Sequence, residues 1–271
     1  MMGSIPIWAL FIGSVVLVVA AIELGYLMGR HSHQRSEEEK ESPVSAIAGS
    51  VLGLVAFMLA FTFGIVSDRY DDRKSLVRDE ANAIGTAWRR TDLLPPGDAA
   101  EAKALVRQYL ETRLEFAKSK TIRAEVLAST LAESKRIQNR LWSMAIAQSS
   151  PGSMSPALAA LYLDSLNDVF DLGALRLAVG VQARVPASIW FVLYALMAMG
   201  MMAVGYQTGV SGSRRSKVRL MLAFSFSLVI ALIVSLDRPD SGVIRVSQQP
   251  LIDLLGDMGV GPEAAKDPGR F

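Results

Sequence analysis

Cysteine is absent from the 271 residues, and histidine occurs only twice, at His31 and His33. The absence of cysteine excludes a disulfide framework and any zinc or iron–sulfur site built on thiolates. Two histidines beside Arg30 and Arg35, with no cysteine nearby, are more typical of a solvated polar connector than of a metal site. We therefore expect neither a metal nor a cofactor.

A large excess of charge of one sign is also lacking. The chain has 28 lysines and arginines against 26 aspartates and glutamates, a formal net charge of +2. So small an excess gives little positive field, which argues against a nucleic-acid partner. Phosphate-binding glycine loops, nucleophile elbows and HExxH motifs are missing, and the glycines of GDMGVG at 256–261 follow no predicted strand. We therefore do not expect an enzyme.

Hydrophobic residues make up 51% of the chain and are separated from the charged ones. Residues 1–67 hold 8 charged side chains, residues 68–186 hold 32, and residues 187–271 hold 14. This distribution predicts four segments along the chain. They are a transmembrane hairpin at 1–67, an extramembrane helical domain at 68–186, a second transmembrane hairpin at 187–236 and a C-terminal tail at 237–271.

Four apolar runs are long enough to cross a hydrocarbon core of about 30 Å as helices. They cover residues 5–28, 44–66, 187–207 and 218–236. The connectors within each pair are short, at residues 29–43 and 208–217, so each pair is expected to form a helical hairpin. The predicted fold is all-α: a polytopic membrane protein whose two hairpins flank an extramembrane helical bundle.

The charged block between the hairpins has helical periodicity. Val77, Ala81, Ile84 and Trp88 recur at spacings of three to four, which predicts one buried helix face. Val106, Tyr109, Arg113 and Ala117 repeat the pattern less cleanly. Breaks at 95–97 and 149–153 leave further helices: one helix or a helix pair predicted at about 121–148, and another helix from about 156 to 177.

The second span is expected to continue into the charged block as one long helix. No proline lies between Pro43 and Pro95, and good helix formers follow the span. The alternative is a simple break near Gly64, because glycine weakens a helix.

One face of the second span consists of small residues, of the type that lets helices approach closely in lipid. They are Ala46, Gly49, Gly53, Ala56, Ala60 and Gly64. Phe57 and Phe61 lie beside this face, one turn apart, and Leu54 lies nearby. Two interpretations remain open. The phenylalanines either fill a packing groove or face lipid, or several copies of the span surround an axis and form an apolar constriction.

Two sets of charged residues are further candidates. Glu23 lies late in the first span, where an acid either has a function or reaches the interface near Arg30. A charged junction follows the second and fourth spans: Asp68, Arg69, Asp71, Asp72, Arg73 and Lys74, then Asp237, Arg238 and Asp240. If the two ends meet, we expect ion pairing, and the alternative is Ca²⁺ bound by the carboxylates.

Residues 60–90, AFTFGIVSDRYDDRKSLVRDEANAIGTAWRR, resemble the stretch where the second membrane helix of a bestrophin enters its extramembrane domain. Residues 170–197, FDLGALRLAVGVQARVPASIWFVLYALM, are similar to the bestrophin helix with a central arginine, here Arg176, that leads to a proline, here Pro186. With SLDRPDSGVIRVSQQPLIDLL at 235–255, nearly the whole chain resembles an uncharacterised bacterial group called bestrophin-like.

The resemblance implies a pentameric anion channel in a bacterial plasma membrane, with the second span lining the pore and Phe57 and Phe61 in an apolar neck. Some family features are missing. The aromatic pair around the Asp-Arg element is reduced to Tyr70, and no long acidic run follows the fourth span. Calcium sensing is therefore not carried over.

The side of the membrane that the helical domain faces stays open. The short loops carry Arg30, Arg35 and Lys40, and then Arg214, Arg215 and Lys217. The positive-inside rule slightly favours cytoplasmic loops, with both termini and the helical domain outside, whereas the resemblance implies the reverse.

The leading functional hypothesis is a homo-oligomeric bestrophin-like channel that conducts small anions. The alternative is a non-conducting membrane scaffold or signalling protein whose helical domain binds a partner.

Overall fold

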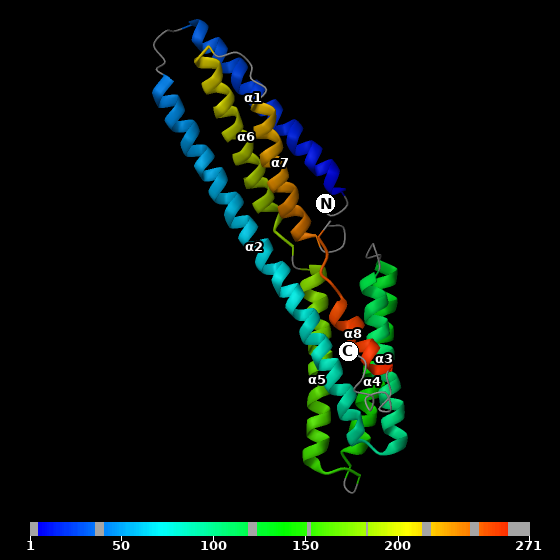
Figure 1. The fold of residues 1–271 in the computed structure, drawn as a ribbon. Coiled ribbons are helices and arrows are strands. Elements are labelled where there is room, and N and C mark those ends of the chain that lie inside the picture. The colour runs from blue at the N-terminus through cyan, green and yellow to red at the C-terminus, as the bar shows by residue number, and fades with distance from the viewer. Residues whose placement is uncertain are drawn as a thin grey trace, which may run out of the picture. The chain divides into compact units, whose positions relative to one another are not determined.

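The computed structural model describes residues 5–35, 41–118, 124–150, 153–182, 184–212, 218–238 and 244–259. Every regular element in these ranges is a helix, which confirms the predicted all-α class (Figure 1). The order is α1 (Ile7–Arg35), α2 (Glu41–Arg90), η2 (Thr91–Leu93), α3 (Pro96–Lys118), α4 (Ala124–Gln148), α5 (Pro156–Leu177), η3 (Ala178–Gln182), α6 (Ala187–Val210), α7 (Val218–Asp237) and α8 (Gln249–Gly259).

Prolines mark several helix starts. Helix α3 begins at Pro96 and α5 at Pro156, where a missing backbone N–H costs nothing and the fixed φ favours the first turn. Ser155 caps α5 because its Oγ accepts a hydrogen bond from the N–H of Leu158 at 3.4 Å. The chain therefore breaks where the sequence predicts, and the helix expected from about 156 to 177 is α5.

Among the described residues, four helices are long and apolar enough to cross a membrane: Ile7–Ser32, Val44–Leu93, Ala187–Val210 and Arg219–Asp237. The second consists mostly of α2 and ends in η2, and α2 itself has 50 residues and continues through Gly64 without a break. The predicted continuation is confirmed, and the alternative break near Gly64 is wrong. Helix α1 also continues to Arg35, so His31 lies in the last turns of a helix, not in the connector expected there.

The chain divides into two compact units. The first comprises residues 1–70 and 184–244, and the second comprises residues 71–183 and 245–271. In the first unit, α1, α6 and α7 lie side by side and pack with the first part of α2 (Figure 1). Its core includes Ile22, Val55, Leu193, Met197 and Ile230, all 1% exposed or less.

Glycines set the close approach of α1 to α6. A Cβ built on Gly25 would lie 1.9 Å from the carbonyl oxygen of Met202, and one built on Gly205 would lie 2.0 Å from that of Ile22. Neither distance leaves room for a methyl group. Gly29 and Gly209 continue the same contact one turn further along. The two helices therefore pack backbone to backbone through paired GxxxG motifs.

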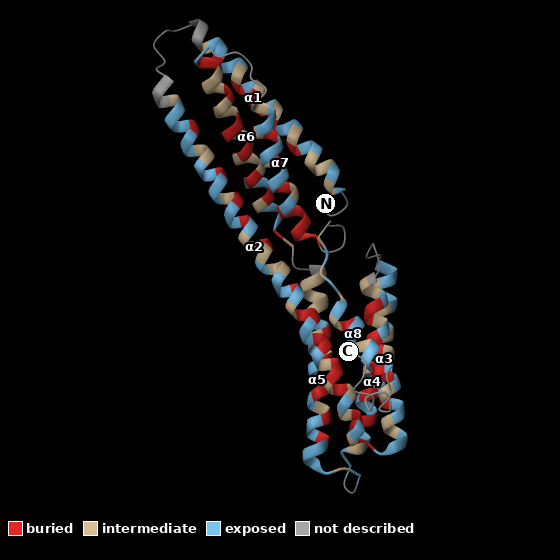
Figure 2. Ribbon diagram, viewed as in Figure 1, coloured by how far each residue is buried: buried red, intermediate tan, exposed pale blue. Residues whose placement is uncertain are grey.

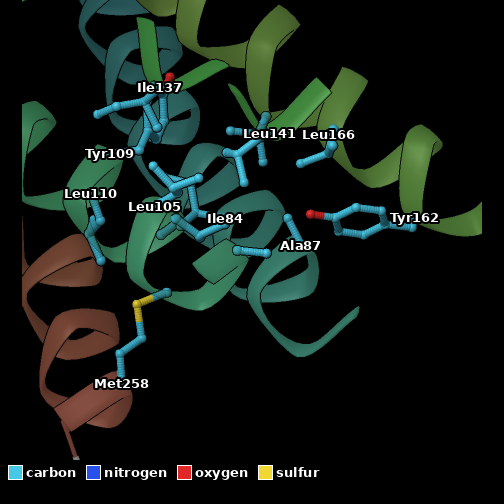
Figure 3. Close-up of a cluster of buried hydrophobic side chains, with 14 of the residues drawn as sticks. Ile84, Ala87, Leu105, Tyr109, Leu110, Ile137, Leu141, Tyr162, Leu166 and Met258 are labelled. Atoms are coloured by element: carbon cyan, nitrogen blue, oxygen red, sulfur yellow. The ribbon is translucent and has the colours of Figure 1, made fainter. Parts of the chain in front are cut away.

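The second unit has its own core, built from the second part of α2 with α3, α4, α5 and α8. Ile84, Leu110, Ile137 and Leu166 are completely buried in it (Figure 3). The predicted stripe is confirmed, because Val77 and Ala81 are buried and Trp88 packs against the cluster. Leu251 and Met258 of α8 complete the core, so the segment expected to be a C-terminal tail contributes to the helical unit.

Candidate functional site

The outer face of α2 exposes the predicted phenylalanines. Phe57 is 63% exposed and Phe61 is 56% exposed, and their rings stack with centroids 6.3 Å apart and an angle of 17° between planes. Leu54 is also exposed. Val55 and Leu59, by contrast, belong to the core of the first unit. The exposed apolar residues therefore form a second face of α2, and many positions along this helix are coloured as exposed in Figure 2. That is expected of a helix that meets lipid or another subunit.

The small-residue face of α2 lies on the open side as well. A Cβ added at Gly49, Gly53 or Gly64 would meet no atom within 4 Å, and Ala56 and Ala60 are exposed. The close helix contacts described above use the glycines of α1 and α6. The predicted packing role of the α2 face therefore has no counterpart among the described contacts of a single chain, and it stays a prediction about a neighbouring chain.

Glu23 pairs with Arg219, which lies near the start of α7. The Oε1 atom of Glu23 and the Nη1 atom of Arg219 are 2.5 Å apart. The side chain of Arg219 is 24% exposed and that of Glu23 is 31% exposed. The position of Glu23 in the sequence is compatible with a function or with a path to the interface near Arg30. The structure adds a specific partner 196 residues away, which reduces the cost of an ionised acid within a membrane helix.

The charged junction gathers around Asp237 at the end of α7. Its Oδ1 accepts a hydrogen bond from the backbone N–H of Val185 at 3.0 Å and lies 3.9 Å from Nη1 of Arg69. Arg184 donates to the Asp237 carbonyl at 3.4 Å. These contacts connect the end of α7 to α2 and to the residues before α6. The two charged clusters therefore meet through an ion pair, the expected form of contact.

The other junction residues have different positions. Asp68, Asp71 and Asp72 are exposed, whereas Arg73 is buried. Arg238 is also buried and donates to the carbonyl of Ile5 at 2.5 Å. Asp240 lies outside the described residues. Within the described ranges, no three His, Cys, Asp or Glu side chains gather as a metal site would require, so the calcium alternative has no support there.

The second unit contains a buried ionic cluster that no sequence pattern predicted. Glu80 of α2 is completely buried, and its Oε1 accepts a hydrogen bond from Nε of Arg113 at 2.7 Å. Arg176 pairs with the other carboxylate oxygen. Arg113 also donates to the carbonyl of Gly173, and Arg176 donates to the side chain of Gln248. One carboxylate thus neutralises half of the charge of two arginines.

Two buried tyrosines lie in the same unit. Burial raises the pKa of Tyr109 above its usual value, and the carboxylate of Glu80 adds to that effect while Arg113 opposes it. Burial raises the pKa of Tyr162 to about 12. Both phenols are therefore neutral at physiological pH.

A comparison with known protein families assigns the chain to a family. Residues 8–251 match the Bestrophin-like domain, which covers most of the chain. The chain belongs to the bestrophin-like family. Membership agrees with the resemblance seen at 60–90 and 170–197. Together with the four apolar helices, it identifies the bestrophin-like chain as a membrane protein.

Solved structures show the same fold for this bestrophin-like chain. A variant of a bacterial bestrophin homologue from Klebsiella pneumoniae is 17% identical, with a TM-score of 0.58, over 88% of this chain and 99% of that one. A second variant of that homologue is 16% identical, with a TM-score of 0.58, over 93% and 97%. A structure described as a membrane protein is 15% identical, with a TM-score of 0.56, over 92% and 98%. No curated protein matches significantly.

Proposed function

We propose that this bestrophin-like protein is a homo-oligomeric channel for small anions, with α2 lining the pore. The observation that carries the proposal is the exposed Phe57–Phe61 stack on a membrane-spanning helix. Family membership favours a channel, because the resemblance of the sequence to bestrophins implies one. The proposal also places the chain in a bacterial plasma membrane, with membrane boundaries at about residues 67 and 187.

A ring of α2 helices gives each exposed feature a role. The glycines at 49, 53 and 64 have open space beside them, so a helix from a second subunit has room to approach. Phe57 and Phe61 then project towards the axis, where rings of apolar side chains exclude water at a narrow point. A constriction of this kind holds the closed state by dewetting. The pentamer implied by the bestrophin resemblance is the expected stoichiometry.

Chloride efflux from liposomes containing the pure protein tests the proposal. We expect efflux that exceeds the efflux of gluconate, and a rise in chloride efflux when Phe57→Ala and Phe61→Ala remove the apolar rings. Phe191→Ala is the matched control, because Phe191 is 75% exposed on α6, outside the proposed pore. Absence of chloride flux, or an equal effect of all three variants, would contradict the proposal.

Particle symmetry gives an independent test. Images of the detergent-solubilised protein are expected to show a ring with α2 nearest the axis. A monomer or dimer would favour the alternative function, a non-conducting scaffold or signalling protein whose helical domain binds a partner.

A further inference from the structure

The outer face of α5 carries a row of acidic side chains. Asp164, Asp168 and Asp171 recur at spacings of four and three residues, so they lie on one helix face, and all three are exposed. Leu161 and Leu175 continue the same face at its two ends and are 46% and 49% exposed. We call these five residues the acidic ridge. It presents three carboxylates between two leucines.

The acidic ridge has no partner in the part of the chain that the structure describes. Its carboxylates form no ion pair there. The one basic side chain of α5, Arg176, is bound to Glu80. The buried residues of α5, such as Leu166 and Val169, lie on the opposite face. Three like charges on one face repel one another, and the two leucines stay in contact with water. A complementary surface would remove both costs.

Helix α2 carries such a surface within the second unit. Lys74, Arg78 and Arg89 are exposed and lie on one face, because their spacings of four and eleven residues are close to whole helical turns. None of the three forms an ion pair with the described residues. We call them the basic row.

The surroundings of the basic row fit the acidic ridge. Gly85 lies between Arg78 and Arg89, and a Cβ built on it would lie 3.2 Å from Cδ1 of Leu254 in α8, so the middle of the row is apolar. Asp71 is the one acid of α2 on this face of the second unit, at its first turn. Asp79 lies about a quarter turn further round the helix. The row therefore keeps an excess of positive charge.

The two surfaces also match in length. Leu161 and Leu175 are 14 residues apart, about 21 Å along a helix, and Lys74 and Arg89 are 15 residues apart, about 22 Å. A contact between two copies of α5 would place carboxylates against carboxylates, which is unfavourable. A contact of the ridge with the row joins two different surfaces, and repetition of such a contact from copy to copy closes a ring.

We propose that the acidic ridge of one copy of the chain binds the basic row of the next copy. The carboxylates pair with the ammonium and guanidinium groups, and the two leucines cover the aliphatic stems of the basic side chains. The inference rests on the homo-oligomer of the proposed function. It depends neither on ion conduction nor on the role of Phe57 and Phe61.

The absence of cysteine makes this contact directly testable by cross-linking. Arg78→Cys and Asp168→Cys are introduced together in the full chain, which is treated in detergent with a short bismaleimide and run on a denaturing gel. We expect a ladder of covalent oligomers, because each copy then carries one cysteine on each surface. Each single variant is expected to remain monomeric on the gel. The matched control combines Arg78→Cys with Glu115→Cys, since Glu115 is an exposed acid of α3 outside the ridge.

Two outcomes of the cross-linking overturn the proposal. Dimers without higher oligomers would indicate a two-fold contact, and an equal ladder from the Glu115→Cys control would show that the cross-links do not report the ridge. Particle images separate this inference from the proposed function. A ring that gives no ladder overturns only the contact, and a monomeric particle overturns both. A ladder from a protein without chloride flux supports the contact and contradicts the channel.

A charge exchange tests the contact without a cross-linker. Asp168→Arg and Arg78→Asp are each expected to weaken association of the copies about tenfold at low salt, because like charges then face one another. The two changes together in one chain are expected to restore most of it. Glu115→Arg is the control and is expected to leave association unchanged. Sedimentation in detergent measures association, and thermal unfolding checks that the variants fold. No weakening in the single variants, or no recovery in the double variant, would overturn the proposal.

Discussion

Arg113 and Glu80 form a hydrogen-bonded ion pair between α3 and α2, with Nε and Oε1 separated by 2.7 Å and neither side chain more than 7% exposed. Arg176 of α5 binds the second carboxylate oxygen of Glu80. A single acid therefore joins three helices of the second unit. The carbonyl of Gly173 and the amide oxygen of Gln248 accept further hydrogen bonds from the guanidinium groups.

Glu80→Gln is expected to lower the free energy of unfolding by about 3 kcal/mol, because removal of one partner leaves two buried arginines without a counter-charge. Thermal unfolding followed by far-UV circular dichroism measures the change. Glu101→Gln is the control, because Glu101 pairs with Arg140 at an exposed site where a pair contributes about 1 kcal/mol or less. Equal losses in the two variants would contradict this account of the cluster.

Gly25→Ala is expected to destabilise the first unit by about 2 kcal/mol or more, because the added Cβ overlaps the Met202 carbonyl and forces α1 away from α6. Gly13→Ala on the same helix has open space at its Cβ and serves as the control. Thermal unfolding in detergent compares the two variants. A lower stability of Gly13→Ala than of Gly25→Ala would show that helix packing at Gly25 is not the cause.

Tyr162→Phe is expected to flatten the loss of stability at alkaline pH. The unfolded chain releases the Tyr162 proton near its ordinary pKa of 10.0, whereas burial raises the pKa in the folded chain to about 12. The contribution of this group is therefore complete below pH 10 and is lost as the pH rises towards 12. Unfolding temperatures measured across this range test the effect. The same alkaline slope in wild type and variant would refute it.

The Tyr162 hydroxyl also has no hydrogen-bond partner among the described residues. Its removal is consequently not expected to destabilise the protein at neutral pH. A large loss there would indicate that the hydroxyl has a partner that this conformation does not include.

Glu23→Gln and Arg219→Gln are each expected to lower stability, and the double variant is expected to lose less than the sum. Each single change leaves one charge in a membrane helix without its partner, 2.5 Å away in the wild type. The coupling is expected to be about 1 kcal/mol. A double-mutant cycle on unfolding temperatures measures it, and strict additivity would mean that the pair is not energetically coupled.

Local patterns in the sequence predict much of the fold. Apolar runs predict the four spans, Pro96 and Pro156 mark helix starts, and the spacing of Val77, Ala81 and Ile84 identifies a buried face. These features depend only on near neighbours in the chain. The division into two hairpins and a helical domain stays a prediction about the bilayer.

One packing feature of the structure has a signal in the sequence, and another has none. The α1–α6 contact had a visible signal, the GxxxG spacing of Gly25 with Gly29 and of Gly205 with Gly209. The Glu80 cluster had no such signal, because its arginines lie 33 and 96 residues away on helices whose relative rotation the sequence does not reveal. Asp237 similarly accepts a hydrogen bond from the backbone N–H of Val185. Because every residue type except proline has this donor, the sequence does not indicate which residue is the partner.

The Glu23–Arg219 pair also determines how the spans respond to a membrane potential. A single charge that crosses the field gains about 2.3 kcal/mol per 100 mV. Glu23 and Arg219, held 2.5 Å apart, carry opposite charges that cancel in this respect. When α1 and α7 move together, they transfer no net charge through the field. This pair therefore contributes no net gating charge to a joint movement of α1 and α7.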